Sequence, residues 1–274
     1  MNDLLLIVCS LFILSSLSAL SAEENFLLLN GISHEVIVEL GPRIDQQMTP
    51  CSTFKIALSL MGYDAGILKN SEIPTWDFEE GYEDYFDSWK ASQTPLSWIR
   101  SSCIWYSKLL TLQLGLEKIQ TYLISLEYGN HDLSVGLIEP GLTNPGWIKS
   151  SLKISPKEQV AFIQKMIQGK FPIADKAVQM TKILLFKETW SEGWLLFGKT
   201  GGCRGFIDEE SGGTLQLGWF VGWIEKEHQF FPFAYLICAE QISFEQRIPR
   251  VKQLLMNFKS VFNNCSQNVE QVLK

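Results

Sequence analysis

Residues 215–239 read LQLGWFVGWI-EKEHQ-FFPFAYLICA, two runs rich in aromatic and β-branched residues on either side of five polar residues. This composition is typical of β-strands. The short polar break favours an antiparallel hairpin of Leu215–Ile224 with Phe230–Ala239. A third run of the same character, Leu195–Lys199, predicts a strand just before this hairpin.

A second hairpin is predicted near the start of the chain. Phe26–Leu29 is a short apolar run, and Asn30-Gly31 is a strong turn pair. Glu35–Leu40 then alternates between apolar and polar residues, as a half-buried strand does. Strands are therefore expected at both ends of the chain.

The middle of the chain reads as helical. Thr49-Pro50 is expected to open a helix, with Thr49 as N-cap. Helical periodicity covers Lys108–Leu126 and Pro156–Ile167, and Arg250–Phe262 reads as a closing helix. The simplest arrangement is α+β: one antiparallel sheet built from both chain ends, flanked by helices, with a mostly helical lobe from the middle and a cleft between them.

Composition excludes several classes of protein. The chain has 274 residues, of which 46% are hydrophobic and 19% charged, as in an ordinary globular domain. Its net charge of −7 argues against binding nucleic acid through phosphate attraction. His34, His131 and His228 are far apart and no C-x-x-C occurs, so no metal site is expected.

The first segment predicts export. Leu4–Leu20 is almost wholly apolar or small, and the run ends in small residues at Ala19 and Ala22 before Glu23-Glu24. This pattern is typical of a signal peptide, here residues 1–22, cut after Ala22. A transmembrane anchor is the alternative, although 17 residues is near the lower limit for spanning. Cleavage would leave a periplasmic chain of residues 23–274, with no membrane segment and five cysteines.

Ser52-Thr53-Phe54-Lys55 matches S-x-x-K near a predicted helix start. A spacing of three places both side chains on one helical face. Burial lowers the pKa of a lysine, and a neutral lysine can take the proton of a neighbouring serine. The motif alone occurs by chance in most chains of this size, so its chemistry needs a second observation.

Lys199-Thr200-Gly201 supplies that observation. Together with Gly193 and Gly198 it formally matches a P-loop, but the intervening Trp194–Phe197 is bulky and strand-like, and no helix follows. The better interpretation is a strand that ends in K-T-G, whose lysine, hydroxyl and bare backbone suit a substrate carboxylate and amide. S-x-x-K and K-T-G occur together in β-lactamases and penicillin-binding proteins.

With both motifs in place, the chain resembles the class D (oxacillinase-type) serine β-lactamases over nearly all of residues 23–274. The resemblance implies the β-lactamase/transpeptidase-like fold in a single catalytic domain of two lobes. Its motifs, in chain order, are Pro50–Leu58, Ser102-Cys103-Ile104 (with Ile104 for the usual valine), Tyr128-Gly129-Asn130, Trp147, Lys199-Thr200-Gly201 and Gly218–Trp223.

The resemblance also implies roles. Ser52 would form an acyl-enzyme, its N–H and that of Gly202 would hold the oxyanion, and Lys55 would be N-carboxylated and act as general base for acylation and deacylation. Ser102 would relay a proton and Trp147 would donate to the carboxylated Lys55. No metal or cofactor is implied beyond carbon dioxide or bicarbonate. The implied substrate-binding residues are Tyr128, Asn130, Lys199, Thr200, Gly201, Gly202 and Arg247, with Arg250 as the alternative to Arg247.

These roles imply hydrolysis of a small-molecule β-lactam, with penicillins as the expected substrates. The alternatives are a penicillin-sensing domain that acylates without turnover, and a cell-wall transpeptidase or carboxypeptidase. If the motifs converge, Cys51 and Cys103 could form a disulfide, with Cys203 as the competing partner. The sequence carries no signal for oligomeric state.

Overall fold

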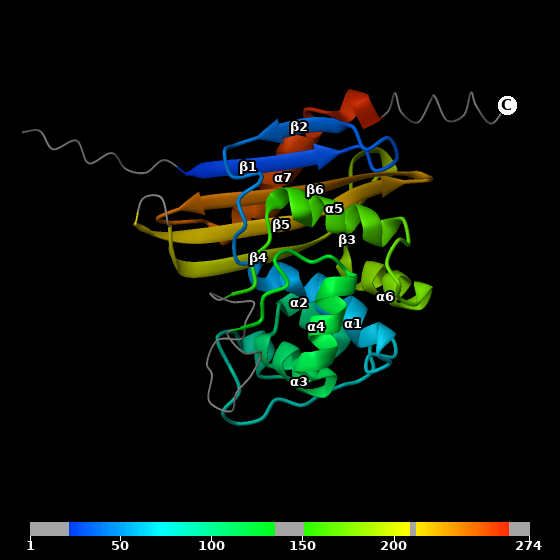
Figure 1. The fold of residues 1–274 in the computed structure, drawn as a ribbon, viewed down its shortest axis with the longest axis vertical. Helices are drawn as coiled ribbons and strands as arrows, with labels where there is room; N and C mark the ends of the chain where they lie inside the picture. The colour runs from blue at the N-terminus through cyan, green and yellow to red at the C-terminus, as the bar shows by residue number, and fades with distance from the viewer. Residues whose placement is uncertain (1–21, 135–150, 209–211, 263–274) are drawn as a thin grey trace, which may run out of the picture.

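The computed structural model describes residues 22–134, 151–208 and 212–262. At its centre is a six-stranded antiparallel sheet in the order β2-β1-β6-β5-β4-β3 (Figure 1). Both ends of the described chain therefore enter one sheet, and the α+β prediction is confirmed. The strands are β1 (Glu23–Leu29), β2 (Val36–Leu40), β3 (Phe186–Thr189), β4 (Leu195–Ile207), β5 (Thr214–Lys226) and β6 (Gln229–Ala239).

Helices lie on both faces of the sheet and in a lobe beside it (Figure 1). Helix α5 (Pro156–Ile167) packs on β1, β5 and β6, and α7 (Arg247–Met256) packs on β5. The lobe beside the sheet is built from helices that the middle of the chain supplies. These are α1 (Lys55–Asp64), α2 (Pro95–Ser101), α3 (Ile104–Leu114), α4 (Leu116–Ser125) and α6 (Asp175–Leu185).

Strand β5 is apolar on both sides because it separates two cores. Trp219 and Val221 lie in the large core shared with α1 and α5. Phe220 and Ile224 lie in the smaller core shared with α7. A strand buried on both faces reads as a continuous apolar run, which is why residues 215–239 are so distinct in the sequence.

Several sequence expectations differ from the structure. The closing helix α7 begins at Arg247 and ends at Met256, and the strand expected to end in K-T-G continues to Ile207. Thr49 is not an N-cap, because residues Cys51–Phe54 form a 3₁₀ turn before α1 and Pro50 takes the cap position. The long helix predicted over Lys108–Leu126 is two helices that meet at Gly115, whose φ of +79° breaks the helical path. Strand β3 was not predicted.

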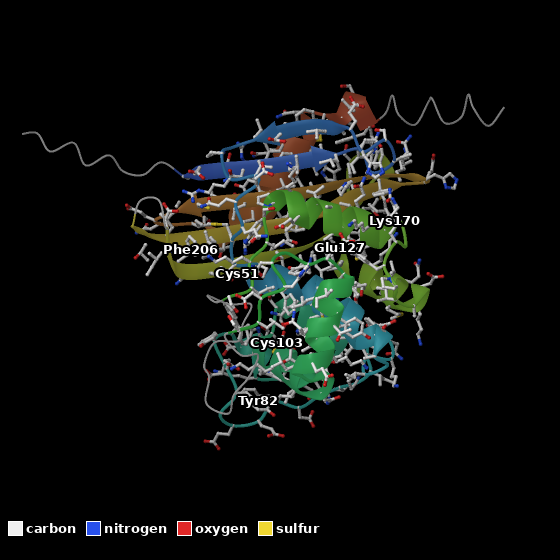
Figure 2. The ribbon with its side chains drawn as sticks, in the orientation of Figure 1. Cys51, Tyr82, Cys103, Glu127, Lys170 and Phe206 are labelled. Atoms are coloured by element: carbon white, nitrogen blue, oxygen red, sulfur yellow. A yellow bond between two sulfur atoms is a disulfide. The ribbon has the colours of Figure 1, made fainter. Side chains whose placement is uncertain are left out.

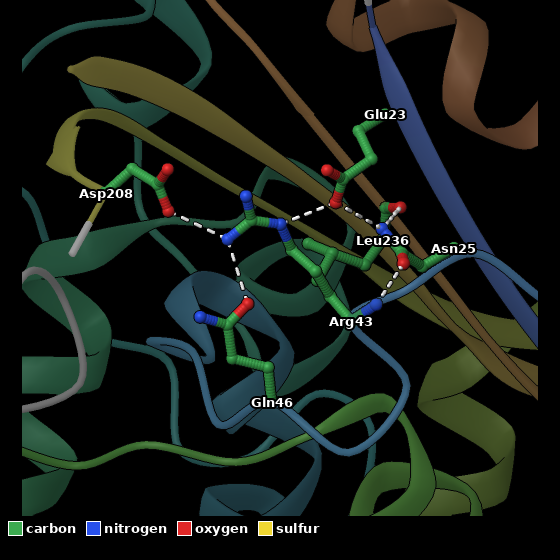
Figure 3. A network of polar contacts seen from close by, with 6 residues as sticks. All are labelled: Glu23, Asn25, Arg43, Gln46, Asp208 and Leu236. Carbon is green, nitrogen blue, oxygen red and sulfur yellow. Dashed lines mark hydrogen bonds and ion pairs between the residues drawn. The ribbon is translucent and has the colours of Figure 1, made fainter. Parts of the chain in front are cut away.

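A buried arginine ties the start of the chain to the far end of β4 (Figure 3). The Arg43 guanidinium donates to Glu23 at 2.5 Å, to Asp208 at 2.8 Å and to Gln46 at 2.8 Å. Its backbone N–H donates to the Asn25 side chain at 2.7 Å. The network joins segments that are 165 residues apart in sequence.

Within the described ranges, none of the helices has the length and apolar character that a membrane crossing requires. The predicted signal peptide falls almost wholly in residues 1–21, outside these ranges, so its cleavage remains a prediction.

Candidate active site

Ser52 and Lys55 meet where the 3₁₀ turn runs into α1. The Lys55 Nζ donates to the Ser52 Oγ at 3.1 Å. Ser52 is half-buried, whereas Lys55 has no exposed surface. The spacing of three residues therefore brings the two side chains together, as the S-x-x-K pattern predicts.

Burial lowers the pKa of the Lys55 amine to about 8, although nearby Cys103 opposes this effect. Among the described residues, no carboxylate forms an ion pair with Lys55. A large fraction of this amine is thus neutral near pH 8. A neutral amine beside a serine hydroxyl can accept its proton.

Lys199 approaches the same place from β4. Its Nζ donates to the Ser102 Oγ at 2.9 Å and to the Thr200 carbonyl at 2.9 Å. Ser102 ends α2 with a left-handed φ of +59°. The structure thus links two motifs that are 97 residues apart in sequence through one hydrogen bond.

Lys199 is 1% exposed and lies among other cations. Burial, and then the positive charges of Lys55, Lys187 and Arg247, hold the pKa of Lys199 well below its usual range. An anion bound beside these groups would relieve their mutual repulsion. The arrangement therefore suits a substrate that carries a carboxylate.

The K-T-G segment lies on an open edge of the sheet. Pairing of β3 with β4 extends only as far as Phe197, so within the described chain Lys199–Gly202 pairs with β5 alone. A Cβ added at Gly201 would stand 3.0 Å from the Pro50 carbonyl oxygen and 3.1 Å from the Thr53 nitrogen. Glycine at position 201 thus lets β4 pack directly against the Ser52 turn.

Arg247 rather than Arg250 reaches this edge. The Arg247 guanidinium donates to the Gly201 carbonyl and lies over the Phe244 ring, with 4.9 Å between the guanidinium carbon and the ring centroid. Arg250 turns away and pairs with Glu24 at 2.7 Å. The preference for Arg247 as the carboxylate-binding arginine is therefore supported by its position.

The disulfide expectation was wrong. Cys51 bonds to Cys203, the competing partner, with their Cα atoms 6.0 Å apart. Cys103 is a buried free thiol within the helical lobe, and Cys238 is a buried free thiol on β6 of the sheet. Figure 2 labels Cys51 at the boundary between sheet and helical lobe and Cys103 further into the lobe. The disulfide thus joins the Ser52 turn to β4, one residue after Gly202.

Comparison with known proteins agrees with this geometry. The penicillin binding protein transpeptidase domain family matches residues 30–255. β-Lactamase OXA-9 of Klebsiella pneumoniae is 33% identical over 218 residues, which are 78% of each chain. β-Lactamase OXA-1 of Escherichia coli is 37% identical over 204 residues, 74% of this chain and 71% of that one. The structure of the class D β-lactamase OXA-427 superposes with a TM-score of 0.77 at 34% identity, covering 86% of this chain and 98% of that one. The chain belongs to the class D serine β-lactamase family.

In this β-lactamase the Tyr-Gly-Asn motif packs against the Ser52 turn and hydrogen-bonds a neighbouring loop. Tyr128 is fully buried, and its ring lies edge-on to Phe54, with 5.5 Å between centroids. The Asn130 side chain donates to the Ser151 carbonyl at 2.7 Å and accepts from the Lys153 N–H at 2.9 Å. The contacts described for Tyr128 and Asn130 are with other residues of the chain. The substrate contacts expected of these two residues stay a prediction.

Trp147 lies outside the described residues, so its donation to Lys55 also stays a prediction. Two residues near the β-lactamase site were not predicted from the sequence. Phe244 packs beneath Arg247, and an aromatic three residues before the arginine is the only signal for it. Lys187 lies on β3, and it was missed because that strand was missed.

No group of three or more His, Cys, Asp or Glu side chains within the described ranges could hold a metal ion.

Proposed function

We propose that this β-lactamase hydrolyses penicillins through an acyl-enzyme on Ser52, with Lys55 as the base. The observation that carries the proposal is the 3.1 Å contact of Lys55 Nζ with Ser52 Oγ beside the open K-T-G edge. The membership of the chain in the class D family supports a β-lactam as the substrate.

In the acylation step the Ser52 Oγ attacks the β-lactam carbonyl carbon, and its proton leaves toward the Lys55 side chain. The N–H groups of Ser52 and Gly202 stabilise the oxyanion. The ring C–N bond then breaks, and the ring nitrogen takes a proton through Ser102, which Lys199 contacts at 2.9 Å. Water then attacks the ester carbonyl: its oxygen stays on the acyl carbon, the bond to the Ser52 Oγ breaks, and a proton of the water passes to that Oγ, which restores the serine.

The substrate carboxylate would meet a prepared set of donors. Lys199 contacts the Thr200 carbonyl and Arg247 contacts the Gly201 carbonyl, so both cations lie along the K-T-G backbone, and Thr200 can add a hydroxyl donor. Charge-assisted hydrogen bonds of this kind orient a carboxylate as well as hold it. A carboxylate on the fused ring would thus fix the β-lactam carbonyl above Ser52.

The surroundings of Lys55 fit an N-carboxylated lysine. The amine is fully buried and its pKa is lowered to about 8, so it is available to react with carbon dioxide. The carbamate, when present, supplies a general base for both acylation and deacylation. Lys55 holds this base within reach of the Ser52 hydroxyl, and the cations at Lys199 and Arg247 favour an anion nearby.

The test is hydrolysis of a chromogenic β-lactam by the mature protein with carbon dioxide removed and then restored. We expect turnover to fall on removal and to return on addition of bicarbonate. A matched chloride addition at the same pH and ionic strength should restore nothing. Turnover that is insensitive to carbon dioxide would contradict a carboxylated Lys55.

A sensor-like function is the second candidate. The regulatory protein BlaR1 of Bacillus licheniformis is 29% identical over 248 residues, which are 90% of this chain and 38% of that one. A sensor would take one equivalent of β-lactam and keep it. The same chromogenic assay separates the candidates, because a sensor gives one stoichiometric burst and no further product.

We also infer export to the periplasm with cleavage after Ala22. Strand β1 begins at Glu23, directly after the predicted cleavage site. N-terminal sequencing of the secreted protein should find Glu23 first. An intact leader on the active protein would contradict this inference and favour an anchor.

A further inference from the structure

The two half-cystines flank the two residues whose N–H groups are proposed to hold the oxyanion. Cys51 is bonded through the chain to Ser52, and Cys203 is bonded through the chain to Gly202. Thus each oxyanion donor is one residue from the same disulfide. This short covalent connection spans a sequence separation of 152 residues, which includes the helical lobe.

We propose that the Cys51–Cys203 disulfide is a positioning device that fixes the separation of the Ser52 and Gly202 N–H groups. The proposal rests on the proposed acyl-transfer function, because only that chemistry needs the two donors to converge on one oxygen. Both donors must point at one place in the transition state, and misplacement by about 1 Å can cost about 100-fold in rate.

The Cys51 side of the connection is held in an uncommon conformation. Cys51 has a φ of +48°, which residues with a side chain rarely adopt. This turn sets the direction in which the chain enters Ser52. The Trp219 indole also donates to the Thr49 carbonyl at 3.0 Å, so the sheet holds the turn on both sides of Pro50.

The Cys203 side lies where the sheet loses its regularity. Gly202 pairs with Gly218 and Cys203 with Leu217, but the register of β4 against β5 shifts between Cys203 and Phe206. The ladder is therefore interrupted directly after Cys203 and resumes at Phe206, and along this part of β4 the described chain has no strand neighbour on the opposite edge. The disulfide thus adds a covalent bond at the last residue before the register shift.

The other buried thiols are poorly placed to exchange with this disulfide. Burial raises the pKa of Cys103 to about 11 and that of Cys238 to about 12. Both are thiols rather than thiolates near pH 7, and thiolate is the form that attacks a disulfide. The described chain thus holds the Cys51–Cys203 pairing without an active internal competitor.

The test removes the disulfide without adding backbone strain. In the double variant Cys51→Gly, Cys203→Ala, glycine accepts the positive φ at position 51. We expect acylation by a penicillin to slow by about 10-fold or more, because removing a whole oxyanion donor costs about 100- to 1,000-fold. Affinity for a boronic acid that mimics the tetrahedral transition state should fall in proportion, whereas KM changes less than kcat.

Cys238→Ala is the matched control, because Cys238 is a buried cysteine that forms no disulfide. It should keep the wild-type acylation rate. Reduction of the folded wild-type protein with a phosphine, followed by thiol counting, gives a second measurement that does not depend on folding of the variant. Reduced protein should show the same loss, and reoxidation should recover it.

A disulfide-free protein, reduced or variant, that is folded and acylates within twofold of wild type would overturn the proposal. Failure of the proposed function gives a different result. In that case the wild-type protein with its disulfide intact forms no Ser52 adduct at all.

Discussion

Lys55 and Lys199 are buried lysines whose pKa values are lowered, and each donates to a different serine hydroxyl. Lys55 donates to the Ser52 hydroxyl and lies at the start of a helix. Lys199 donates to Ser102 and lies on the sheet edge. In the proposed mechanism, Lys55 takes the proton of Ser52, and Lys199 lies beside Ser102, through which the ring nitrogen is protonated.

The lowered pKa of Lys55 predicts how carbon dioxide reacts with the site. Only the neutral amine reacts, and with a pKa of about 8 the neutral fraction is about 1% at pH 6 and about half at pH 8. At a fixed concentration of dissolved carbon dioxide, recovery of decarboxylated enzyme should therefore accelerate about tenfold per pH unit and level off just above pH 8. Recovery that still accelerates between pH 9 and 10 would show an unperturbed lysine instead.

Arg247 and Arg250 give a matched pair of substitutions at one helix end. Arg247→Ala removes a guanidinium beside the K-T-G strand, so kcat/KM for a carboxylate-bearing penicillin should fall by about 10- to 100-fold, mostly through KM. Arg250→Ala removes contacts with Glu24 and Gln253 but none with the K-T-G strand, so it should leave the kinetics near wild type. Steady-state kinetics of both variants decides this, and a larger loss in Arg250→Ala would reverse the assignment.

At the scale of elements, the Tyr-Gly-Asn motif fastens the loop from Ser151 to Lys153. Gly129 has a φ of +57°, and a Cβ there would stand 2.1 Å from the Lys153 carbonyl oxygen. Asn130 hydrogen-bonds both ends of the same loop. The motif thus connects this loop, through Asn130, to Phe54 and the Ser52 turn, which Tyr128 contacts.

Gly129→Ala should be much more destabilising than a glycine substitution that meets no neighbour. Gly169 has a φ of +63° with nothing within 4 Å of its Cβ position, so Gly169→Ala should cost only about 1–2 kcal/mol of unfolding free energy for the left-handed backbone. Gly129→Ala should cost about 1–3 kcal/mol more, because the loop must move. Urea unfolding of both variants measures the difference. Equal losses would show that the Gly129 contact with the Ser151–Lys153 loop does not contribute to stability.

Local patterns predicted the elements whose signals are local. Helix α5 was predicted at its observed bounds, Pro156–Ile167, because its apolar residues recur with helical periodicity. In the structure Ser155 and Glu158 add a capping box at its start. The β5–β6 hairpin was evident because both faces are apolar. Strand β3 was missed because it has only four residues, three of which pair with β4, and it follows α6 without a break.

The contacts of the candidate site also divide into those that local spacing predicts and those that depend on tertiary packing. The Ser52–Lys55 pair follows from helical spacing, which the sequence shows directly. The Ser102–Lys199 contact and the Cys51–Cys203 disulfide depend on how the lobes meet, and no local pattern distinguishes Cys203 from Cys103 as the partner of Cys51. The motif order could suggest that the segments converge but could not set which side chains touch.

In the molecule as a whole, the sheet closes the fold by pairing the first strand of the described chain, β1, with its last strand, β6. Strand β1 pairs with β6 as well as β2, so the first described residues lie inside the sheet rather than at its edge. The Arg43 network secures this junction, since it links β1 to the end of β4 (Figure 3). The K-T-G strand is thus anchored at the end that lies beyond the active site.

Arg43→Ala should destabilise the whole fold. The variant leaves the carboxylate of Asp208 buried, with its side chain 3% exposed, so we expect a loss of about 3–5 kcal/mol in unfolding free energy. Lys157→Ala, which breaks an exposed ion pair with Asp45, should leave the unfolding midpoint unchanged. A small effect for Arg43→Ala would mean that the ends hold together without the network.

The most direct test of the account is to mix the mature protein with a large excess of a penicillin. Ring-opened product is counted per enzyme while the protein mass is followed by rapid quenching. We expect many turnovers, with a transient adduct on the peptide that contains Ser52 and none in Ser52→Ala. A single equivalent of product with a lasting adduct on Ser52 would contradict hydrolysis, and turnover in Ser52→Ala would contradict the nucleophile.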